Sequence, residues 1–413
     1  MSKNLDQLIN GFNITNIKPG LGRISELMSY YSNPHKEYPC ILVGGTNGKG
    51  SITNLLSSIM NNHNLTTGLY TSPHLIRVNE RIRVSEIMIS DDEIYDILTA
   101  IEYTNHKKKI GISFFEALTA SAFIYFEKNK VDIAIIEVGM GGIWDATNIV
   151  DPLVSVISNV SIDHTNYLGV SIDSISREKA GIIKDNVPVV TGCEGQSLDI
   201  IKEYCKQMRS DLYINNIDFY IDKNTNTYNG ILWDIKNLGL KDQVLFQLNN
   251  ISVSLAVSEI LSIKKLIDFD LKKILEITNN FSLEGRMETI KNNPPLILDG
   301  AHNQDSANKL VKSIINKYKD LKFTFLVSIQ SSKDYKSFIN ELSIIAECFI
   351  FTSLPNNLMA DPVDLRTYAE SNLGIKSKVI QNSELAYKHI INGKSPSCVT
   401  GSLYLVGSIK ELL

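Results

Sequence analysis

The clearest chemical pattern in the sequence is a glycine-rich stretch around a lysine, VGGTNGKGS at residues 43–51. Backbone N–H groups of such a loop can turn towards a phosphate, the lysine can reach the terminal phosphates, and a hydroxyl can bind Mg²⁺. In the common form of the motif the hydroxyl directly follows the lysine. Here Gly50 follows Lys49 and the hydroxyl comes one residue later, at Ser51. A glycine-rich turn with an incidental lysine is the alternative. An apolar run before the stretch and a helical pattern after it favour phosphate binding.

Two more polar residues follow apolar runs that are typical of buried strands. Glu137 ends the run VDIAIIE, and His164 lies just past the run PLVSVISNV, within DHT. A carboxylate in such a place is costly to bury unless it is paired or bound to a metal. In an open α/β sheet both residues would emerge at the carboxyl edge, where ligands bind. A neutral imidazole is an unusual ligand for Mg²⁺, so His164 could equally cap a helix.

These residues need a parallel sheet to bring them together. Four continuous Val/Ile-rich runs are predicted as buried strands, at residues 40–45, 131–139, 152–160 and 187–192. The best helical period lies at 51–62, where five apolar residues fall on one face: Ile52, Leu55, Leu56, Ile59 and Met60. The expected class is α/β with a mostly parallel sheet of the P-loop type.

In the second half of the chain the alternation of predicted strands and helices is interrupted and later restarts. Residues 215–240 predict a polar antiparallel meander, either a sheet edge or a subdomain, and a helix follows from about 250 to 263. After the turn-rich stretch 282–295 the alternation of strands and helices restarts. We therefore expect an ATP-binding central domain at 1–285 and a smaller Rossmann-like α/β domain at 286–413.

Bulk composition narrows the class of protein. The 413 residues carry a net charge of −4 with no basic block, which argues against nucleic acid or an anionic membrane as a partner. No apolar run approaches the roughly 20 residues of a bilayer crossing, and the N-terminus lacks the apolar core of a signal peptide. The five scattered cysteines form no C-x-x-C pair, so we expect a reduced, cytoplasmic protein without a zinc site.

The late hydroxyl of the loop matches the variant G-T-N-G-K-G-S of the Mur ligase superfamily, which contains the folylpolyglutamate and dihydrofolate synthases. Other segments resemble this folate branch in the same order along the chain. They are YTSPHLIRVNERIRV (70–84), EVGMGGIWDATNIV (137–150), IDHTNYLG (162–169), REKAGIIK (177–184), EGRMETI (284–290), LDGAHNQDS (298–306) and TGSLYLVG (400–407), the last similar to the family's C-terminal strand. The resemblance spans nearly the whole chain.

This resemblance implies an ATP site with two Mg²⁺ ions. The expected nucleotide contacts are Gly45, Thr46, Asn47, Gly48, Lys49, Gly50, Ser51, Asn250, Arg286, Asp299 and His302. One Mg²⁺ would lie between Glu137 and His164 with a hydroxyl at Thr71, and the second at Ser51. Lys49, His164, Arg286 and Lys179 are the expected catalytic residues. Asn249 could replace Asn250, and the second-domain residues could instead form junction salt bridges and turn caps.

The lysine that matches Lys179 is carbamylated by CO₂ in this family, and its carboxylate helps to hold the second Mg²⁺. Carbamylation requires an uncharged amine, so burial would have to lower the pKa of Lys179 from about 10.4. The alternative is an ordinary lysine on a helix surface.

The resemblance also places the pteridine part of a folate at Ser113, Phe114 and Phe115, with Asp145 and Ala146 opposite. Without the resemblance, the segment ISFFEALTASAF would be core packing.

The implied reaction is the ATP-dependent joining of L-glutamate to the carboxylate of a folate, with dihydropteroate as a further candidate acceptor. It would proceed through an acyl phosphate, whose formation releases ADP and whose reaction with glutamate releases phosphate. We expect a monomer. Two alternatives remain: a Mur-type ligase for a peptidoglycan precursor, and a nucleotide-binding switch without ligase activity.

Overall fold

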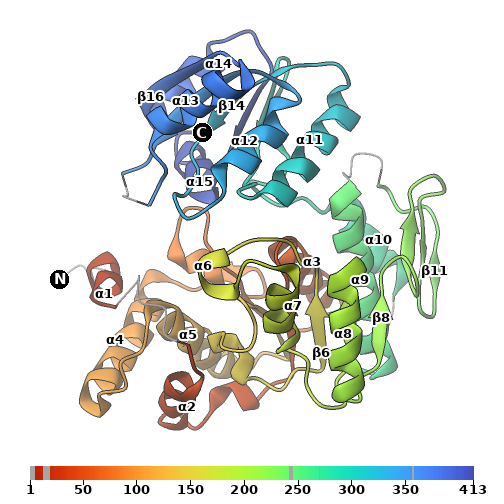
Figure 1. Cartoon of the computed structure of the whole chain (residues 1–413). Helices are drawn as coiled ribbons and strands as arrows, with labels where there is room; N and C mark the ends of the chain where they lie inside the picture. The colour runs from red at the N-terminus through yellow and green to blue at the C-terminus, as the bar shows by residue number, and fades with distance from the viewer. Residues whose placement is uncertain (1–4, 13–18, 241–244, 269, 356–357) are drawn as a thin grey trace. The chain divides into compact units, whose positions relative to one another are not determined.

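The computed structural model of the chain describes residues 5–12, 19–240, 245–268, 270–355 and 358–413 (Figure 1). They divide into two compact units. The first unit is drawn from Met1–Pro73, Val78–Val160 and Ser171–Phe281, and the second from His74–Arg77, Ser161–Val170 and Ser282–Leu413. The second unit thus includes two short segments from the first half of the chain. The domain boundary between residues 285 and 286 stays a prediction.

The first unit contains an eight-stranded sheet in the order β4-β3-β2-β5-β1-β6-β7-β8. Its strands are β1 (Cys40–Gly44), β2 (Thr67–Tyr70), β3 (Ile82–Val84), β4 (Ile87–Met88), β5 (Ile133–Glu137), β6 (Val154–Ile157), β7 (Val189–Thr191) and β8 (Leu212–Ile214). The six strands from β2 to β8 in this order are parallel, whereas β3 and β4 add an antiparallel edge. The predicted mostly parallel sheet is confirmed. Its antiparallel edge comes from β3 and β4, and not from residues 215–240, where a sheet edge or a subdomain was expected.

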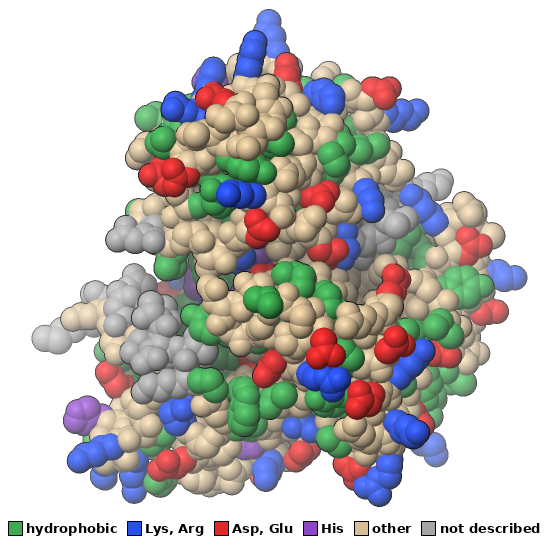
Figure 2. Space-filling model, in the orientation of Figure 1, with side chains coloured by type: hydrophobic (Ala, Val, Ile, Leu, Met, Phe, Trp, Pro, Cys, Tyr) green, Lys and Arg blue, Asp and Glu red, His purple; other side chains and the backbone are tan. Residues whose placement is uncertain are grey.

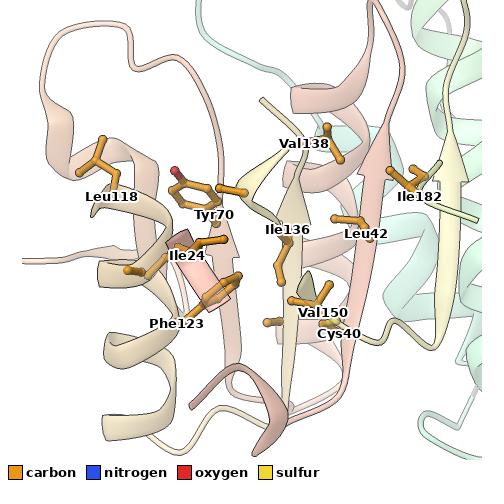
Figure 3. Packing of buried hydrophobic residues seen from close by; sticks show 14 of the residues in the cluster. Ile24, Cys40, Leu42, Tyr70, Leu118, Phe123, Ile136, Val138, Val150 and Ile182 are labelled. Carbon is orange, nitrogen blue, oxygen red and sulfur yellow. The ribbon is translucent and has the colours of Figure 1, made fainter. Parts of the chain in front are cut away.

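Both faces of this sheet are buried, as its continuous apolar strands require. On β1, Leu42 belongs to one core cluster, whereas Ile41 and Val43 belong to the other. Figure 3 shows part of the first cluster, in which the strand residues Tyr70, Ile136 and Leu42 belong to the same core as the helix residues Leu118 and Phe123. The helices that contribute to this cluster are α2 (Gly22–Ser29), α4 (Asp91–Lys108), α5 (Phe114–Lys128), α7 (Ile172–Ala180) and α8 (Gly195–Gln207), and α1 (Leu5–Gly11) packs against it.

The opposite face is covered by α3 (Lys49–Asn62), α9 (Leu245–Ile263) and α10 (Leu271–Asn280). All five apolar residues predicted on one face of the 51–62 helix are buried in this cluster. The polar meander forms a separate three-stranded antiparallel sheet of β9 (Tyr220–Asp222), β10 (Thr227–Asn229) and β11 (Asp234–Ile235). Buried Glu259 of α9 holds it by accepting hydrogen bonds from the Tyr228 hydroxyl and the backbone N–H groups of residues 231–233, all at 2.7–2.9 Å.

The second unit contains a six-stranded sheet in the order β12-β13-β17-β14-β15-β16, parallel except for the antiparallel pair of β12 and β13. Its strands are β12 (Glu288–Asn292), β13 (Pro295–Leu298), β14 (Phe323–Val327), β15 (Ala346–Ser353), β16 (Ser377–Asn382) and β17 (Ser397–Thr400). Its helices are α6 (Thr165–Leu168), α11 (Gln304–Tyr318), α12 (Tyr335–Ser343), α13 (Pro362–Leu373), α14 (Ser383–Ile391) and α15 (Leu403–Lys410). The predicted Rossmann-like class is confirmed.

The expectation that residues 400–407 form the C-terminal strand is wrong. Strand β17 ends at Thr400, and most of the segment belongs to α15. Gly401 has φ +103, which breaks the extended backbone, and the Ser402 hydroxyl then accepts the N–H of Leu405 as a helix cap.

Acidic and basic side chains are interspersed on the face of the molecule in Figure 2. Among the helices of the described residues, none combines the length and apolar character needed to traverse a bilayer. All five cysteines are free thiols.

Candidate active site

The predicted phosphate loop connects β1 to α3 at the carboxyl edge of the large sheet. Gly45 and Gly48 have φ +131 and +88, a backbone region that side chains with a Cβ rarely adopt. The N–H groups of Thr46 and Asn47 are held by the carbonyl and side-chain oxygens of Asn159, at 2.9 and 2.8 Å. The loop therefore has a fixed backbone shape at the start of a 14-residue helix, where phosphate binding is favourable.

Asn250 of α9 lies against this loop. A Cβ placed on Gly48 would come within 2.5 Å of the Asn250 side-chain oxygen. Asn250 is buried, with its amide donating to Gln247 at 3.2 Å, whereas Asn249 is exposed. The structure thus places Asn250, and not its neighbour, beside the loop.

Two lysine ammonium groups meet at one loop carbonyl. Lys49 Nζ donates to the Gly45 oxygen at 3.1 Å and to the Thr46 oxygen at 3.1 Å, and Lys179 Nζ donates to the same Gly45 oxygen at 2.8 Å. The two nitrogens are therefore no more than 5.9 Å apart. Lys179 lies in the last turn of α7 but is only 3% exposed, which excludes the helix-surface interpretation.

Glu137 is the last residue of β5, and only 4% of it is exposed. It accepts the N–H of Ser72 at 3.0 Å, and a Cβ placed on Gly50 would lie 3.7 Å from one of its carboxylate oxygens. The predicted hydroxyl ligands Ser51 and Thr71 are also buried. A buried carboxylate beside a glycine of the phosphate loop suits a hard divalent cation.

Across the described part of the chain, no three His, Cys, Asp or Glu side chains gather into a cluster that could hold a metal ion. The predicted ligand set contains only two residues of these types, Glu137 and His164. Since Mg²⁺ usually keeps several water ligands and takes one or two carboxylates, Glu137 and the hydroxyls fit this ion better than they fit zinc.

The residues predicted to bind a pteridine lie at the start of α5 and in the loop after β5. A Cβ on Gly139 would collide with the Phe115 ring and lie 3.2 Å from an Asp145 oxygen, so this glycine allows the ring and the carboxylate to approach each other. Phe114 faces the buried Arg81, whose guanidinium carbon lies 5.9 Å from the ring centre.

Asp145 and Ser113 of this set already have structural partners. Asp145 accepts the N–H of Met140 at 2.8 Å and that of Thr147 at 3.0 Å, and burial raises its pKa while these hydrogen bonds oppose the rise. The Ser113 hydroxyl forms a capping box with Glu116 at the start of α5. Ala146 is buried in the turn that Asp145 caps. Their contacts with a substrate stay predictions.

In the second unit, the predicted nucleotide residues surround the end of β13. Both oxygens of buried Asp299 accept backbone N–H groups, from Met287 and Ala301, each at 2.8 Å. Burial raises the pKa of Asp299, although the positive charge of Arg286 acts in the opposite direction. His302 Nδ1 pairs with the Gly300 carbonyl at 2.9 Å.

His164 also belongs to the second unit. It occupies the N-cap position of α6 in a left-handed conformation, φ 51 and ψ 38, but its side chain makes no capping bond, so the capping interpretation is wrong for the imidazole. The adjacent Asp163 is buried and binds the side chains of Asn303 and Lys333, with His302 close by. Asp163, His302, Asn303 and Lys333 are called the Asp163 cluster below.

Sequence reasoning left Asp163 out of the metal ligands, with orientation of its loop or a contact to the metal through water as alternatives, and it missed Asn303 and Lys333. The asparagine gave a usable signal, because Asn303 precedes a helical pattern and caps α11 by accepting the N–H of Ser306 at 2.9 Å. The sequence around Lys333 gave no signal of a functional role, since a lone lysine in a turn is usually solvated.

Comparison with known proteins gives matches over both units. Models of the Mur ligase middle domain and of the dihydrofolate synthetase C-terminal domain match residues 43–192 and 282–412. The dihydrofolate synthase/folylpolyglutamate synthase of Bacillus subtilis is 30% identical over 420 residues, covering 96% of this chain and 95% of the relative.

Two solved structures are similar over the whole chain. Escherichia coli FolC in complex with DHPP and ADP has a TM-score of 0.89 at 26% identity, covering 99% of this chain and 96% of that one. The bifunctional folylpolyglutamate synthase/dihydrofolate synthase of Yersinia pestis, complexed with AMPPNP and a Mn ion, also has a TM-score of 0.89 at 26% identity, covering 100% and 98%.

Proposed function

This chain belongs to the family of dihydrofolate synthases and folylpolyglutamate synthases, and we propose that it joins L-glutamate to the carboxylate of a folate or of dihydropteroate in an ATP-dependent reaction. The family resemblance predicted from the sequence is confirmed. The observation that carries the proposal is the pair of buried ionisable residues at the phosphate loop, Glu137 and Lys179. A nucleotide switch would need the loop but has no use for a second buried amine at the Gly45 carbonyl.

Joining an acid to an amine in water requires activation of the carboxylate. In the proposed reaction an oxygen of the substrate carboxylate attacks the γ-phosphorus of ATP, ADP leaves, and an acyl phosphate forms. The amino group of glutamate then attacks the acyl carbon, loses a proton, and expels phosphate. Lys49 and the loop N–H groups that Asn159 does not bind would contact the phosphates, so catalysis depends on positioning and on electrostatic stabilisation, with no covalent enzyme intermediate.

A divalent cation is part of this proposal. The solved relative with AMPPNP and Mn supports a metal-assisted nucleotide site in the family. We assign Glu137, Thr71 and His164 to one Mg²⁺ and Ser51 to a second, where the ions would neutralise charge that develops on the phosphoryl oxygens. Asn250, Arg286, Asp299 and His302 are proposed to contact the nucleotide.

The substrate pocket is proposed at Phe114, Phe115, Ser113, Asp145 and Ala146. Aromatic faces beside a buried carboxylate suit a flat heterocycle with N–H donors. The related E. coli structure with DHPP and ADP supports a pterin-type ligand for the family. We further propose a monomer in the cytoplasm, which gel filtration with light scattering and cell fractionation would test.

A direct assay tests the reaction. The purified chain is given ATP, Mg²⁺ and L-glutamate, with dihydropteroate or tetrahydrofolate in separate tubes, and products are identified by mass. We expect a product heavier by one glutamyl residue with at least one acceptor, together with ADP and phosphate. AMP and pyrophosphate would contradict the acyl-phosphate route. Phosphate release that does not depend on acceptor and glutamate together would favour the switch.

Carbamylation of Lys179 has its own test. Lys179→Ala is expected to lower turnover at least about 1,000-fold, which bicarbonate does not restore, because the variant lacks the amine that would carry the carboxylate and help hold the second Mg²⁺. The matched control is Lys184→Ala, which removes a partly buried lysine bound to the Asn148 carbonyl at 2.9 Å. A carbamate signal from ¹³C-bicarbonate should appear in the wild type and the control and be lost in Lys179→Ala. Equal turnover of Lys179→Ala and Lys184→Ala would refute the assignment.

A further inference from the structure

The segment Ser161–Val170 leaves the large sheet after β6 and returns to it at α7, yet it packs as part of the second unit. It carries His164, the residue we assign to a metal. The way in which this segment is held therefore determines where the imidazole lies.

The anchor of the segment is Asp163, of whose side chain only 4% is exposed. Its Oδ1 accepts the backbone N–H of His164 at 2.7 Å and forms an ion pair with Lys333. Its Oδ2 accepts the side-chain amide of Asn303 at 2.9 Å and lies 3.7 Å from His302 Nε2. Both carboxylate oxygens are thus bound by side chains from residues far along the chain.

Lys333 is an unusual partner, because its side chain is only 7% exposed. It comes from the turn between β14 and α12. Burying an ammonium and a carboxylate together is tolerated when each compensates the other, and removal of one leaves the other uncompensated. The position of Asp163 therefore depends on Lys333.

Asp163 in turn controls the backbone of the next residue. His164 adopts φ 51, a conformation that is unfavourable for a side chain with a Cβ and needs support from its surroundings. The N–H of His164 is held in this conformation by the Asp163 carboxylate. The side chain of His164 is 41% exposed, and its Nε2 atom lies 4.0 Å from Oδ2 of Asp163.

We propose that Lys333 and Asn303 are positioning residues for His164, acting through Asp163. The inference rests on the proposed function in so far as His164 is a metal-binding residue. Lys333 and Asn303 themselves touch neither substrate nor metal in this assignment. They fix the backbone from which the imidazole extends, as carboxylate partners outside a metal site commonly do.

Two variants with matched controls test this proposal. Lys333→Met keeps the apolar stem and removes the charge, and Lys312→Met removes an exposed lysine of the same unit. Asn303→Ser keeps a residue that can cap α11 but removes the amide that binds Asp163. Its control, Asn382→Ser, makes the same change at the cap of α14, where Asn382 accepts the N–H of Leu385 at 2.9 Å.

The first two measurements do not depend on ligase activity. Amide hydrogen exchange of peptides that cover 161–170 should become at least about tenfold faster in Lys333→Met and Asn303→Ser, and stay unchanged in both controls. The His164 imidazole resonance, identified among the seven histidines by its loss in His164→Gln, should shift in the same two variants. Unchanged exchange and an unmoved resonance in Lys333→Met and Asn303→Ser would overturn the proposal.

The second measurement connects position to metal use. In the ligase assay, the Mg²⁺ concentration for half-maximal rate should rise about tenfold in Lys333→Met and Asn303→Ser. The KM for the folate acceptor should stay unchanged. A rise in that KM alone would contradict the assignment to His164. If the wild type has no ligase activity, the proposed function fails, while exchange and resonance still decide the positioning role.

Discussion

The phosphate loop of the first unit and the Asp163 cluster of the second both hold functional residues in place, but by different means. The loop is shaped by its own glycines and by backbone N–H groups that bind Asn159. In the Asp163 cluster, Asp163 is held by charged and polar side chains of residues 303 and 333, in addition to the backbone N–H of His164. The glycine pattern of the loop can be recognised in a sequence. The distant side chains that hold the Asp163 cluster cannot, and neither can Asn159, which binds the loop from 112 residues away.

Asp299 shares features of both the phosphate loop and the Asp163 cluster. Like Asp163 it is a buried aspartate of the second unit, but its partners are backbone N–H groups of nearby residues. For Asp163, burial acts to raise the pKa, but His302 and the charge of Lys333 outweigh it and hold the pKa well below the usual range. For Asp299 burial prevails and the pKa is raised. For Asp299, neither the charge of Arg286 nor the two backbone donors outweighs the effect of burial.

The largest effect is expected from breaking the charged pair. Lys333→Met should lower the free energy of unfolding of the second unit by about 3–5 kcal/mol, because it leaves Asp163 buried without its cation. The double variant Asp163→Leu/Lys333→Met should recover more than half of the loss. Urea unfolding followed by hydrogen exchange of peptides from 304–343 measures both. An equal loss in the single and double variants would mean that packing, and not charge, holds the cluster.

A smaller effect is expected from a glycine of the loop. Gly48→Ala forces a Cβ into a positive-φ conformation and against Asn250, which should destabilise the first unit by about 1–3 kcal/mol. Gly50→Ala is the matched control, since its Cβ would meet Glu137 only at 3.7 Å and φ is not positive. The control should change stability by no more than about 1 kcal/mol. Similar losses in both variants, measured by thermal unfolding, would show that the loop backbone is less specific than the comparison requires.

The smallest effect concerns the pH dependence of stability through Asp299. Because the folded protein raises the pKa of this carboxyl, the folded state binds its proton more tightly than the unfolded state does. Its contribution to stability therefore decreases as the pH rises from below about 4, the usual aspartate value, through the raised pKa. Wild type should gain stability relative to Asp299→Asn when the pH is lowered from 7 to 4. A relative loss over that interval, in paired urea titrations, would show that Arg286 dominates over burial.

Much of the first unit could be predicted because its signals are local. Apolar runs gave the parallel strands, and the order strand, glycine loop, helix gave the phosphate loop around Lys49. Burial of Lys179 was implied only by the family resemblance and by no local pattern, because its helix carries a polar sequence. The capping box at Ser113 was present in the sequence as S-F-F-E and was not used.

The second unit was less predictable for a physical reason. The conformation of His164 depends on Asp163, whose partners come from the turn before α12 and from the cap of α11. No periodicity connects these positions, so only the folded chain brings them together. The error at residues 400–407 was of another kind, since Gly401 and Ser402 are a strand-end glycine and a helix-cap serine that local reasoning could have recognised.

Because the second unit includes two segments from the first half of the chain, it cannot be produced as one continuous C-terminal fragment that contains all of its residues. A polypeptide of residues 282–413 alone would lack the segment 161–170, which contains Asp163. The buried ammonium of Lys333 would then have lost its carboxylate partner. The fragment would also lack Leu75, whose carbonyl lies against Gly407 so closely that a Cβ there would collide with it. Such a fragment should fold poorly unless synthetic peptides that contain both segments, 74–77 and 161–170, are supplied in trans.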